Sequence, residues 1–121
     1  MISIERFSEI LDALAEELPP EFFEGLNLGI TVSPQAKLHE QAQRDDLFIQ
    51  GEYCRSAMGQ GIVIYYGSFC RLWENASQQE LINEMRKVLR HEFRHHMETR
   101  AGERGLEIED ERQLNEYLGG Q

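Results

Sequence analysis

The longest helical pattern in the sequence runs from Ser77 to about Arg100 and constrains the fold more than any other stretch. Ser77 and Glu80 have the spacing of a capping box at its start. Apolar side chains then recur with the helical period and define one stripe, which a helix buries against a core. The stripe consists of Leu81, Ile82, Met85, Val88, Leu89, Phe93 and Met97. We therefore expect a long amphipathic helix whose opposite, basic face is solvated.

The segment His91-Glu92-Phe93-Arg94-His95 lies inside this helix and matches the pattern H-E-x-x-H. Residues four apart lie on the same helix face, so His91 and His95 can direct both imidazoles at one point. Glu92 lies about 100° further round the axis, where its carboxylate can contact a water held by a metal. The pattern predicts Zn²⁺ ligands at His91 and His95 and a general base at Glu92. The alternative is a charged surface helix with two histidines at helical spacing.

The helical phase separates the third histidine from the other two. His91 and His95 project to the border between the apolar stripe and solvent, and Glu92 points nearer the stripe. His96 falls in the middle of the stripe. We expect His96 to be buried, with its ring satisfied by a backbone carbonyl or a carboxylate, although a role in supporting the zinc ligands is also open.

The other periodic segments indicate the fold class. Strand patterns occur at residues 26–32, 47–53 and 62–66, and the continuous apolar run of the last indicates burial on both faces. Helical patterns occur at residues 4–18, 69–75 and 109–118, besides the motif helix, which Gly102 and Gly105 are expected to end. Residues 35–46 are polar and are expected to form a loop. Strands grouped together and helices grouped together predict an α+β domain, in which a small three- to four-stranded sheet packs on the motif helix.

Length and charge bound the classes of protein to which the chain can belong. Its 121 residues, of which 40% are apolar, predict one soluble domain spanning residues 1–121. The formal net charge of −10 argues against nucleic-acid partners and against anionic membrane surfaces. Cys54 and Cys70 lack C-x-x-C spacing and no secretory signal precedes the first helix, so we expect reduced thiols and a cytoplasmic location.

These features together resemble a known family. Residues 62–67 followed by the run His91 to His96 resemble the small bacterial zincin-like metallopeptidases, also called minimal zincins. The resemblance extends over nearly the whole chain and includes the acidic first helix and the segments 101–103 and 107–110. It implies a single zincin-like metallopeptidase domain, a Zn²⁺ cofactor and a peptide or protein substrate whose peptide bonds are hydrolysed.

The third zinc ligand is where the sequence departs from related patterns. Metzincins continue the motif with glycine and a third histidine, whereas this chain has Glu98 and Ala101 at those positions. Zinc accepts carboxylates, and the resemblance to family members that carry an aspartate before a helix points to Asp110. We rank Asp110 first, followed by Glu107, Glu103 and Glu111.

Two further interpretations stay open at this stage. One is a catalytically silent zincin-like domain that acts as a protein-binding module, and the other is a metal-free interaction domain with a chance motif. An enzyme would also need a hydrogen-bond donor for the charge that develops on the substrate carbonyl. The available donors, each of which has a structural role as its simpler explanation, are His39, Tyr65, Tyr66 and Tyr117.

Overall fold

Strand β5 (Gly59–Tyr65) forms the centre of the sheet in the computed structural model, which describes residues 1–40 and 47–104. Strand β1 (Gly29–Ser33) pairs with it in parallel, and strand β4 (Gly51–Ser56) pairs with it antiparallel on the other side. The sheet order is therefore β1-β5-β4. Residues Ile62 and Ile64 of β5 are 0% and 1% exposed, so the middle strand carries the buried face of the sheet.

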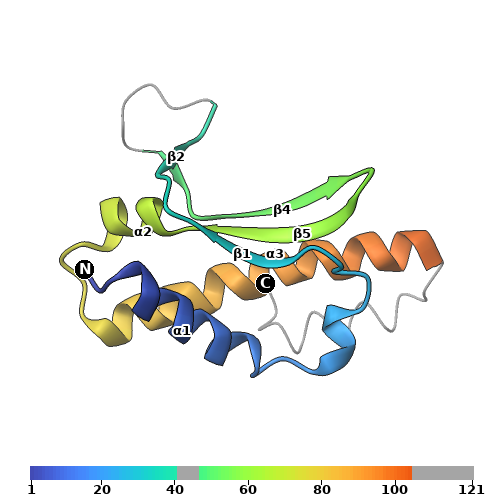
Figure 1. The fold of residues 1–121 in the computed structure, drawn as a ribbon, viewed down its shortest axis with the longest axis horizontal. Helices are drawn as coiled ribbons and strands as arrows, with labels where there is room; N and C mark the ends of the chain where they lie inside the picture. Colours follow the sequence, from blue (N-terminus) through green and yellow to red (C-terminus); the bar gives the residue numbers. More distant parts are fainter. Residues whose placement is uncertain (41–46, 105–121) are drawn as a thin grey trace.

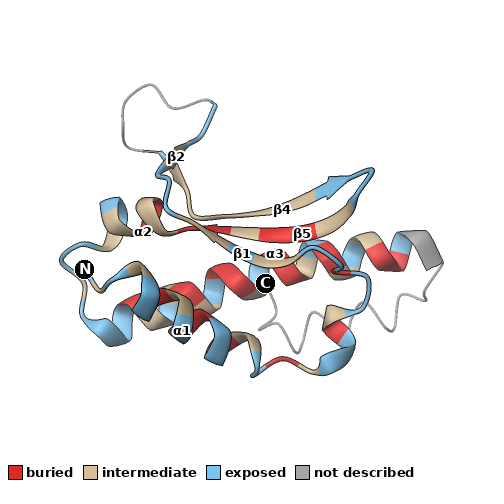
Figure 2. Cartoon of the chain, viewed as in Figure 1, coloured by how far each residue is buried: buried red, intermediate tan, exposed pale blue. Residues whose placement is uncertain are grey.

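Helices α1 (Ile4–Ala15) and α3 (Gln78–Arg104) lie on the same face of this sheet (Figure 1). Their buried sides face each other and β5, while their outer sides are exposed (Figure 2). The core between them is built from large apolar side chains, the least exposed of which are Phe7, Leu11, Ile62, Ile64, Phe69, Met85, Leu89 and Phe93. The predicted apolar stripe of the motif helix is thus the surface that the sheet covers.

The starts of both long helices follow from local sequence signals. Ser3 caps α1 by accepting a hydrogen bond from the backbone N–H of Arg6 at 3.1 Å. At α3, the Glu80 N–H donates to Ser77 Oγ at 3.1 Å and the Ser77 N–H donates to Glu80 Oε1 at 2.9 Å. The predicted capping box is confirmed. Helix α1 ends at Ala15, ahead of a short 3₁₀ helix, η1 (Pro20–Phe23).

The strands differ from the sequence-based prediction in their bounds. The pattern at residues 47–53 is divided between β3 (Phe48–Ile49) and β4, and the expected loop contains β2 (Lys37–Leu38), which pairs antiparallel with β3. Helix α2 (Tyr66–Trp73) follows β5 directly. The predicted burial of β5 on both faces is confirmed in part: α1 and α3 cover one face, and on the other face Tyr65 is buried while Val63 is half-buried.

The motif helix extends beyond its predicted end at about Arg100, since α3 includes the predicted breaker Gly102 and continues to Arg104, the residue before the second predicted breaker, Gly105. A glycine in a helix interior costs only about 1 kcal/mol, and tertiary contacts can offset it. Arg100 and Ala101, immediately before the glycine, are 7% and 5% exposed, and Arg100 donates to Glu24 Oε2 at 3.1 Å. Packing therefore carries the helix past its breaker. The predicted helix at residues 109–118 lies outside the described residues.

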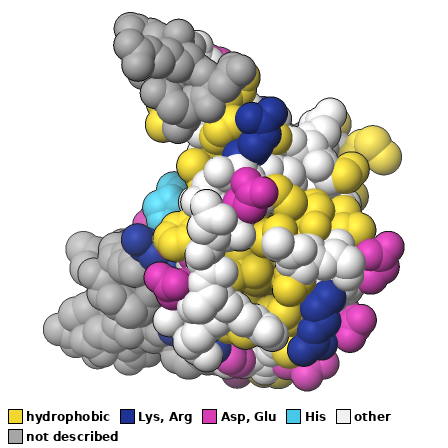
Figure 3. All heavy atoms as spheres, turned by 90° about the vertical axis from the view of Figure 1, so that its left-hand side faces the viewer, with side chains coloured by type: hydrophobic (Ala, Val, Ile, Leu, Met, Phe, Trp, Pro, Cys, Tyr) yellow, Lys and Arg dark blue, Asp and Glu magenta, His cyan; other side chains and the backbone are white. Residues whose placement is uncertain are grey.

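The molecule is an α+β protein with a small mixed sheet, as predicted. None of the helices in the described part of the chain has the length and apolarity needed to cross a membrane. On the face shown in Figure 3, lysine and arginine side chains stand apart from one another among apolar and acidic ones. Cys54 in β4 and Cys70 in α2 are free thiols and half-buried.

Candidate metal centre

Helix α3 presents His91 and His95 as a converging pair. Both side chains are exposed, their rings are nearly perpendicular, and the two Nε2 atoms are 3.1 Å apart. Two Zn–N bonds of about 2.0–2.1 Å at a tetrahedral angle would separate the nitrogens by about 3.3 Å. The pair therefore fits a shared zinc ion without rearrangement of the helix.

Burial lowers the pKa of His91, and the positive charges that His95 and Arg94 can carry lower it further. A lowered pKa keeps the imidazole neutral at physiological pH, which is the form that binds a metal. The electrostatics of the helix surface thus favour the ligand form of His91.

The described residues bring these two predicted ligands together but not a third. No group of three histidine, cysteine, aspartate or glutamate side chains in the described part of the chain has the arrangement of a metal site. Three of the ranked carboxylates, Asp110, Glu107 and Glu111, lie outside the described residues, and so does the side chain of Glu103. The identity of the third ligand stays a prediction.

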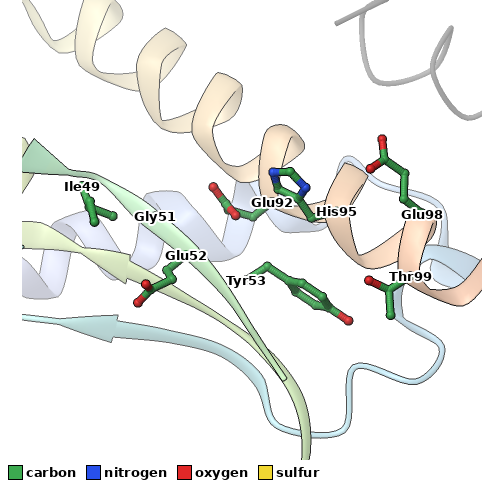
Figure 4. A pocket seen from close by; sticks show the side chains of 8 residues that line it. All are labelled: Ile49, Gly51, Glu52, Tyr53, Glu92, His95, Glu98 and Thr99. Atoms are coloured by element: carbon green, nitrogen blue, oxygen red, sulfur yellow. The ribbon is translucent and has the colours of Figure 1, made fainter. Parts of the chain in front are cut away.

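Glu92 lies at the floor of a groove between α3 and strand β4. The groove consists of two cavities of about 620 Å³ and 330 Å³ that share Ile49, Gly51 and Glu92 in their lining. His95 lines the larger cavity and His91 the smaller, so the histidine pair stands at the rim above Glu92. Figure 4 shows Glu92 and His95 on the helix, beside the strand that carries Tyr53.

The Glu92 side chain is only 7% exposed although it borders this groove. Burial raises the pKa of Glu92, while positive charge on His95 and a hydrogen bond from the Tyr53 backbone lower it in part. A carboxylate with a raised pKa is a stronger base than a solvated one, and its affinity for protons lies closer to neutral pH. Glu92 therefore has the environment expected of a proton acceptor.

Strand β4 is an edge of the three-stranded sheet, with β5 as its partner there. The Tyr65 N–H donates to the Gln50 carbonyl at 2.8 Å, which makes Gln50 and Tyr65 a hydrogen-bonded pair of the antiparallel ladder. In such a ladder every second residue turns its N–H and C=O outward. By the observed register these residues are Gly51, Tyr53 and Arg55, next to the groove.

Gly51 allows the strand to approach the helix at Glu92. A Cβ atom at this position would lie 2.7 Å from Val88 Cγ1, 3.1 Å from Ile64 Cδ1 and 3.3 Å from Glu92 Cγ. The first distance is too short for any real contact, so only glycine fits without a shift of the strand. Sequence reasoning missed Gly51, because a close approach between segments far apart in the chain leaves no local signal.

His96 is fully buried, as its place in the apolar stripe predicted. Its Nε2 lies 2.7 Å from the Glu24 carbonyl oxygen and its Nδ1 lies 2.8 Å from the Tyr53 hydroxyl. The prediction of a histidine satisfied by a backbone carbonyl is confirmed. No local pattern pointed to Tyr53, which lines the groove and reaches from the edge strand to the helix.

Among the described residues, none of the predicted donors His39, Tyr65 and Tyr66 lines the groove. Tyr65 donates to Glu52 Oε1 at 2.7 Å, and the same carboxylate forms an ion pair with Lys37 at 2.7 Å. The Tyr66 hydroxyl donates to the Ile2 carbonyl near the N-terminus. His39 follows β2 and borders neither cavity, and Tyr117 lies outside the described residues. The structure thus assigns structural contacts to Tyr65 and Tyr66.

Comparison with known proteins identifies a relative by structure. The chain superposes on the solved structure of a conserved hypothetical protein, TTHA0227, from Thermo thermophilus, with a TM-score of 0.73 and 32% sequence identity. The match covers 84% of this chain and 99% of the other. The chain belongs to the TTHA0227 family. The name of that protein states no activity, so membership of the TTHA0227 family supports the fold of this chain and assigns it no reaction. No protein-family model and no curated protein matches the chain.

Proposed function

We propose that the protein is a zinc-dependent metallopeptidase with a zincin-like fold. The observation that carries the proposal is the pair of Nε2 atoms, 3.1 Å apart, at the rim of a groove whose floor is the buried Glu92 carboxylate. Two imidazoles one helical turn apart and an adjacent carboxylate are the parts that metal-assisted hydrolysis requires. His91, Glu92 and His95 lie on a long amphipathic helix under a small sheet, which is the arrangement that the sequence predicted for them.

His91 and His95 would hold the metal together with a carboxylate, for which Asp110 ranks first and Glu107, Glu103 and Glu111 follow. When bound, zinc lowers the pKa of a water molecule toward neutrality and polarises a carbonyl group. The protein's own contribution is to fix both imidazoles on a rigid helix and to keep His91 neutral.

Glu92 serves as the general base and then as the general acid. Its carboxylate takes a proton from the attacking water and returns it to the leaving amine. The raised pKa of Glu92 supports both halves of this role, since burial makes the carboxylate a stronger proton acceptor than a solvated one and the acid it forms can return the proton.

The outward backbone groups of β4 support an extended peptide as the substrate. A peptide can add to the free edge of a sheet as a further strand, with main-chain hydrogen bonds supplying affinity. Gly51 turns its N–H and C=O outward beside Glu92, and Tyr53 turns its C=O outward, while the Tyr53 N–H is bonded to the Glu92 carboxylate. A bound strand there would pass between the sheet edge and the histidine pair. The net charge of −10 is consistent with a protein or peptide partner rather than nucleic acid or an anionic membrane.

The second candidate is a zincin-like module that binds a protein and cleaves nothing. The small size of the chain favours it, because 121 residues leave little material for substrate-specificity subsites. A weak or incomplete metal site would leave the groove as a binding surface. Retention of a buried carboxylate beside the histidines favours the enzyme, because a binding module gains nothing from the cost of burying Glu92.

The test begins with metal content. Protein purified without added metal, and then loaded with zinc, should bind one zinc ion per chain, and His91→Ala should abolish this binding. The wild type should hydrolyse members of a mixed peptide library, whereas Glu92→Gln should keep the zinc and lose hydrolysis. Zinc binding without any cleavage by the wild type would support the binding module instead. Absence of zinc binding would overturn both.

A further inference from the structure

The side chain of Tyr53 connects edge strand β4 to helix α3. The Tyr53 hydroxyl lies 2.8 Å from Nδ1 of His96, and the two rings are 5.3 Å apart. The contact joins residues 43 positions apart in the sequence. Tyr53 itself borders the groove, since it lines the larger cavity together with Glu92 and His95 (Figure 4).

The direction of each hydrogen bond can be derived. The Glu24 carbonyl oxygen can only accept, so His96 Nε2, at 2.7 Å, must carry the proton and donate. In a neutral ring Nδ1 is then an acceptor, and the Tyr53 hydroxyl donates to it. The Tyr53 proton is therefore directed at His96 and away from the groove. Tyr53 is not placed to donate to a reacting carbonyl.

The other end of this contact is buried. His96 is 0% exposed, and its two ring nitrogens contact the Glu24 carbonyl oxygen and the Tyr53 hydroxyl. Arg100, one turn further along α3, forms an ion pair with the Glu24 side chain at 3.1 Å. The segment around Glu24 is thus fixed to α3 at two places, and it holds the His96 ring in one orientation.

Tyr53 also touches Glu92 through its main chain. A hydrogen bond runs from the Tyr53 backbone to the Glu92 carboxylate. Since Tyr53 turns its N–H away from β5 by the observed register, this bond depends on how far β4 stands from α3. The side chain of Tyr53 fixes that separation at the same residue.

We propose that Tyr53 is a positioning residue, anchored by His96, that fixes the edge strand relative to α3 and so holds the Glu92 carboxylate and the substrate-binding edge in register. This inference rests on the proposed function for its consequence in catalysis but not for its structural content. A misplacement of reacting groups by about 1 Å can reduce a rate about a hundredfold, so a positioning residue outside the reaction can have a large effect.

The first test compares two tyrosines that each donate one hydrogen bond. Tyr53→Phe should lower kcat by about tenfold or more with KM changed less than about threefold, while zinc content stays at one ion per chain. Tyr66→Phe is the matched control, because its hydroxyl donates to the Ile2 carbonyl far from the groove. It should lower the melting temperature without changing kcat. Equal kcat values for Tyr53→Phe and wild type would overturn the inference.

The second test concerns the anchor. His96→Gln keeps an acceptor for Tyr53 and a donor for Glu24, and should retain kcat within about threefold, whereas His96→Leu should lose as much as Tyr53→Phe. The double variant of Tyr53→Phe with His96→Leu should be no slower than His96→Leu alone, because the two residues act as one unit. Additive losses would show that they act separately. If His96→Leu does not fold, the comparison of His96→Gln with Tyr53→Phe still decides.

A third measurement does not need hydrolysis. Amide exchange by NMR on the metal-free protein should show slow exchange at Tyr53 in the wild type and in Tyr66→Phe, with faster exchange in Tyr53→Phe. The amide of Ile62 in the central strand is an internal reference for global stability. If the wild type cleaves no peptide, the proposed function fails while this result still tests the positioning role. Unchanged protection of the Tyr53 amide in Tyr53→Phe would refute it.

Discussion

The contact between β4 and α3 at Gly51 yields a prediction whose size can be worked from the structure. In Gly51→Ala the new methyl group would lie 2.7 Å from Val88 Cγ1 and 3.1 Å from Ile64 Cδ1. Val88 is β-branched and in a helix, so its side chain has one strongly preferred rotamer and cannot turn away. Ile64 is 1% exposed and has no free space to enter. The strand must move outward instead.

Overpacking of this kind costs about 1–3 kcal/mol. Alanine also restricts the unfolded chain more than glycine does, which returns about 0.4–1 kcal/mol. The mid-values of these two ranges differ by about 1.3 kcal/mol, so we expect Gly51→Ala to lower the free energy of unfolding by about that amount. For a chain of 121 residues the melting temperature should fall by about 4 °C for each kcal/mol.

Gly102→Ala is the matched control for this experiment. A Cβ at Gly102 would meet no atom within 4 Å, and the residue lies inside α3. The same substitution should there raise the free energy of unfolding by about 0.5–1 kcal/mol. Urea unfolding followed by circular dichroism measures both. A Gly51→Ala protein as stable as the wild type would refute the argument that glycine is required for the approach of β4 to α3.

Three further outcomes are expected. Arg86→Met removes the two hydrogen bonds, at 2.9 and 3.1 Å, that lower the pKa of Glu17; because Glu17 is 38% exposed the loss should be at most about 1 kcal/mol. A carboxylate whose pKa is lowered in the folded state stabilises the protein above its usual pKa of 4.5. The stability difference between Arg86→Met and the wild type, measured by urea unfolding, should therefore be full at pH 7 and disappear as the pH falls from 4.5 through the lowered pKa of Glu17. Ser77→Ala removes the cap of α3 and should cost about 1 kcal/mol by the same assay. Zinc at about a hundred times its dissociation constant should stabilise the wild type by about 2.7 kcal/mol. His91→Ala should abolish this gain, and because His91 is exposed the substitution should change the stability of the metal-free protein by no more than about 0.5 kcal/mol.

The parts of the fold that local patterns encode were predictable from the sequence. The capping box and the apolar stripe placed α3 and its phase, and that phase separated the exposed His91 and His95 from the buried His96. The α+β class followed from the order of the periodic segments. These features depend on residues close to one another in the sequence, so local sequence patterns were sufficient to predict them.

The parts that depend on tertiary contact were not predictable. Gly102 has the sequence signal of a helix end, but the packing of Arg100 and Ala101 carries the helix past it. The roles of Gly51 and Tyr53 depend on the sheet register, which brings each of them against a helix that begins at Gln78. The third metal ligand, with Asp110 as the first candidate, stays a prediction because it lies outside the described residues.

The position of Glu92 combines these local and tertiary effects. Helical phase directs its side chain to the edge of the apolar stripe, and the close approach of β4 at Gly51 then removes most of its contact with water. Burial raises the pKa of Glu92, so its ionised form opposes folding at neutral pH. A chain under selection for stability alone would gain from a neutral side chain at this position. The glutamate, the glycine that buries it and the tyrosine that holds the strand beside it are best explained together, as the means by which a small domain keeps a base next to the two imidazoles that we propose to bind zinc.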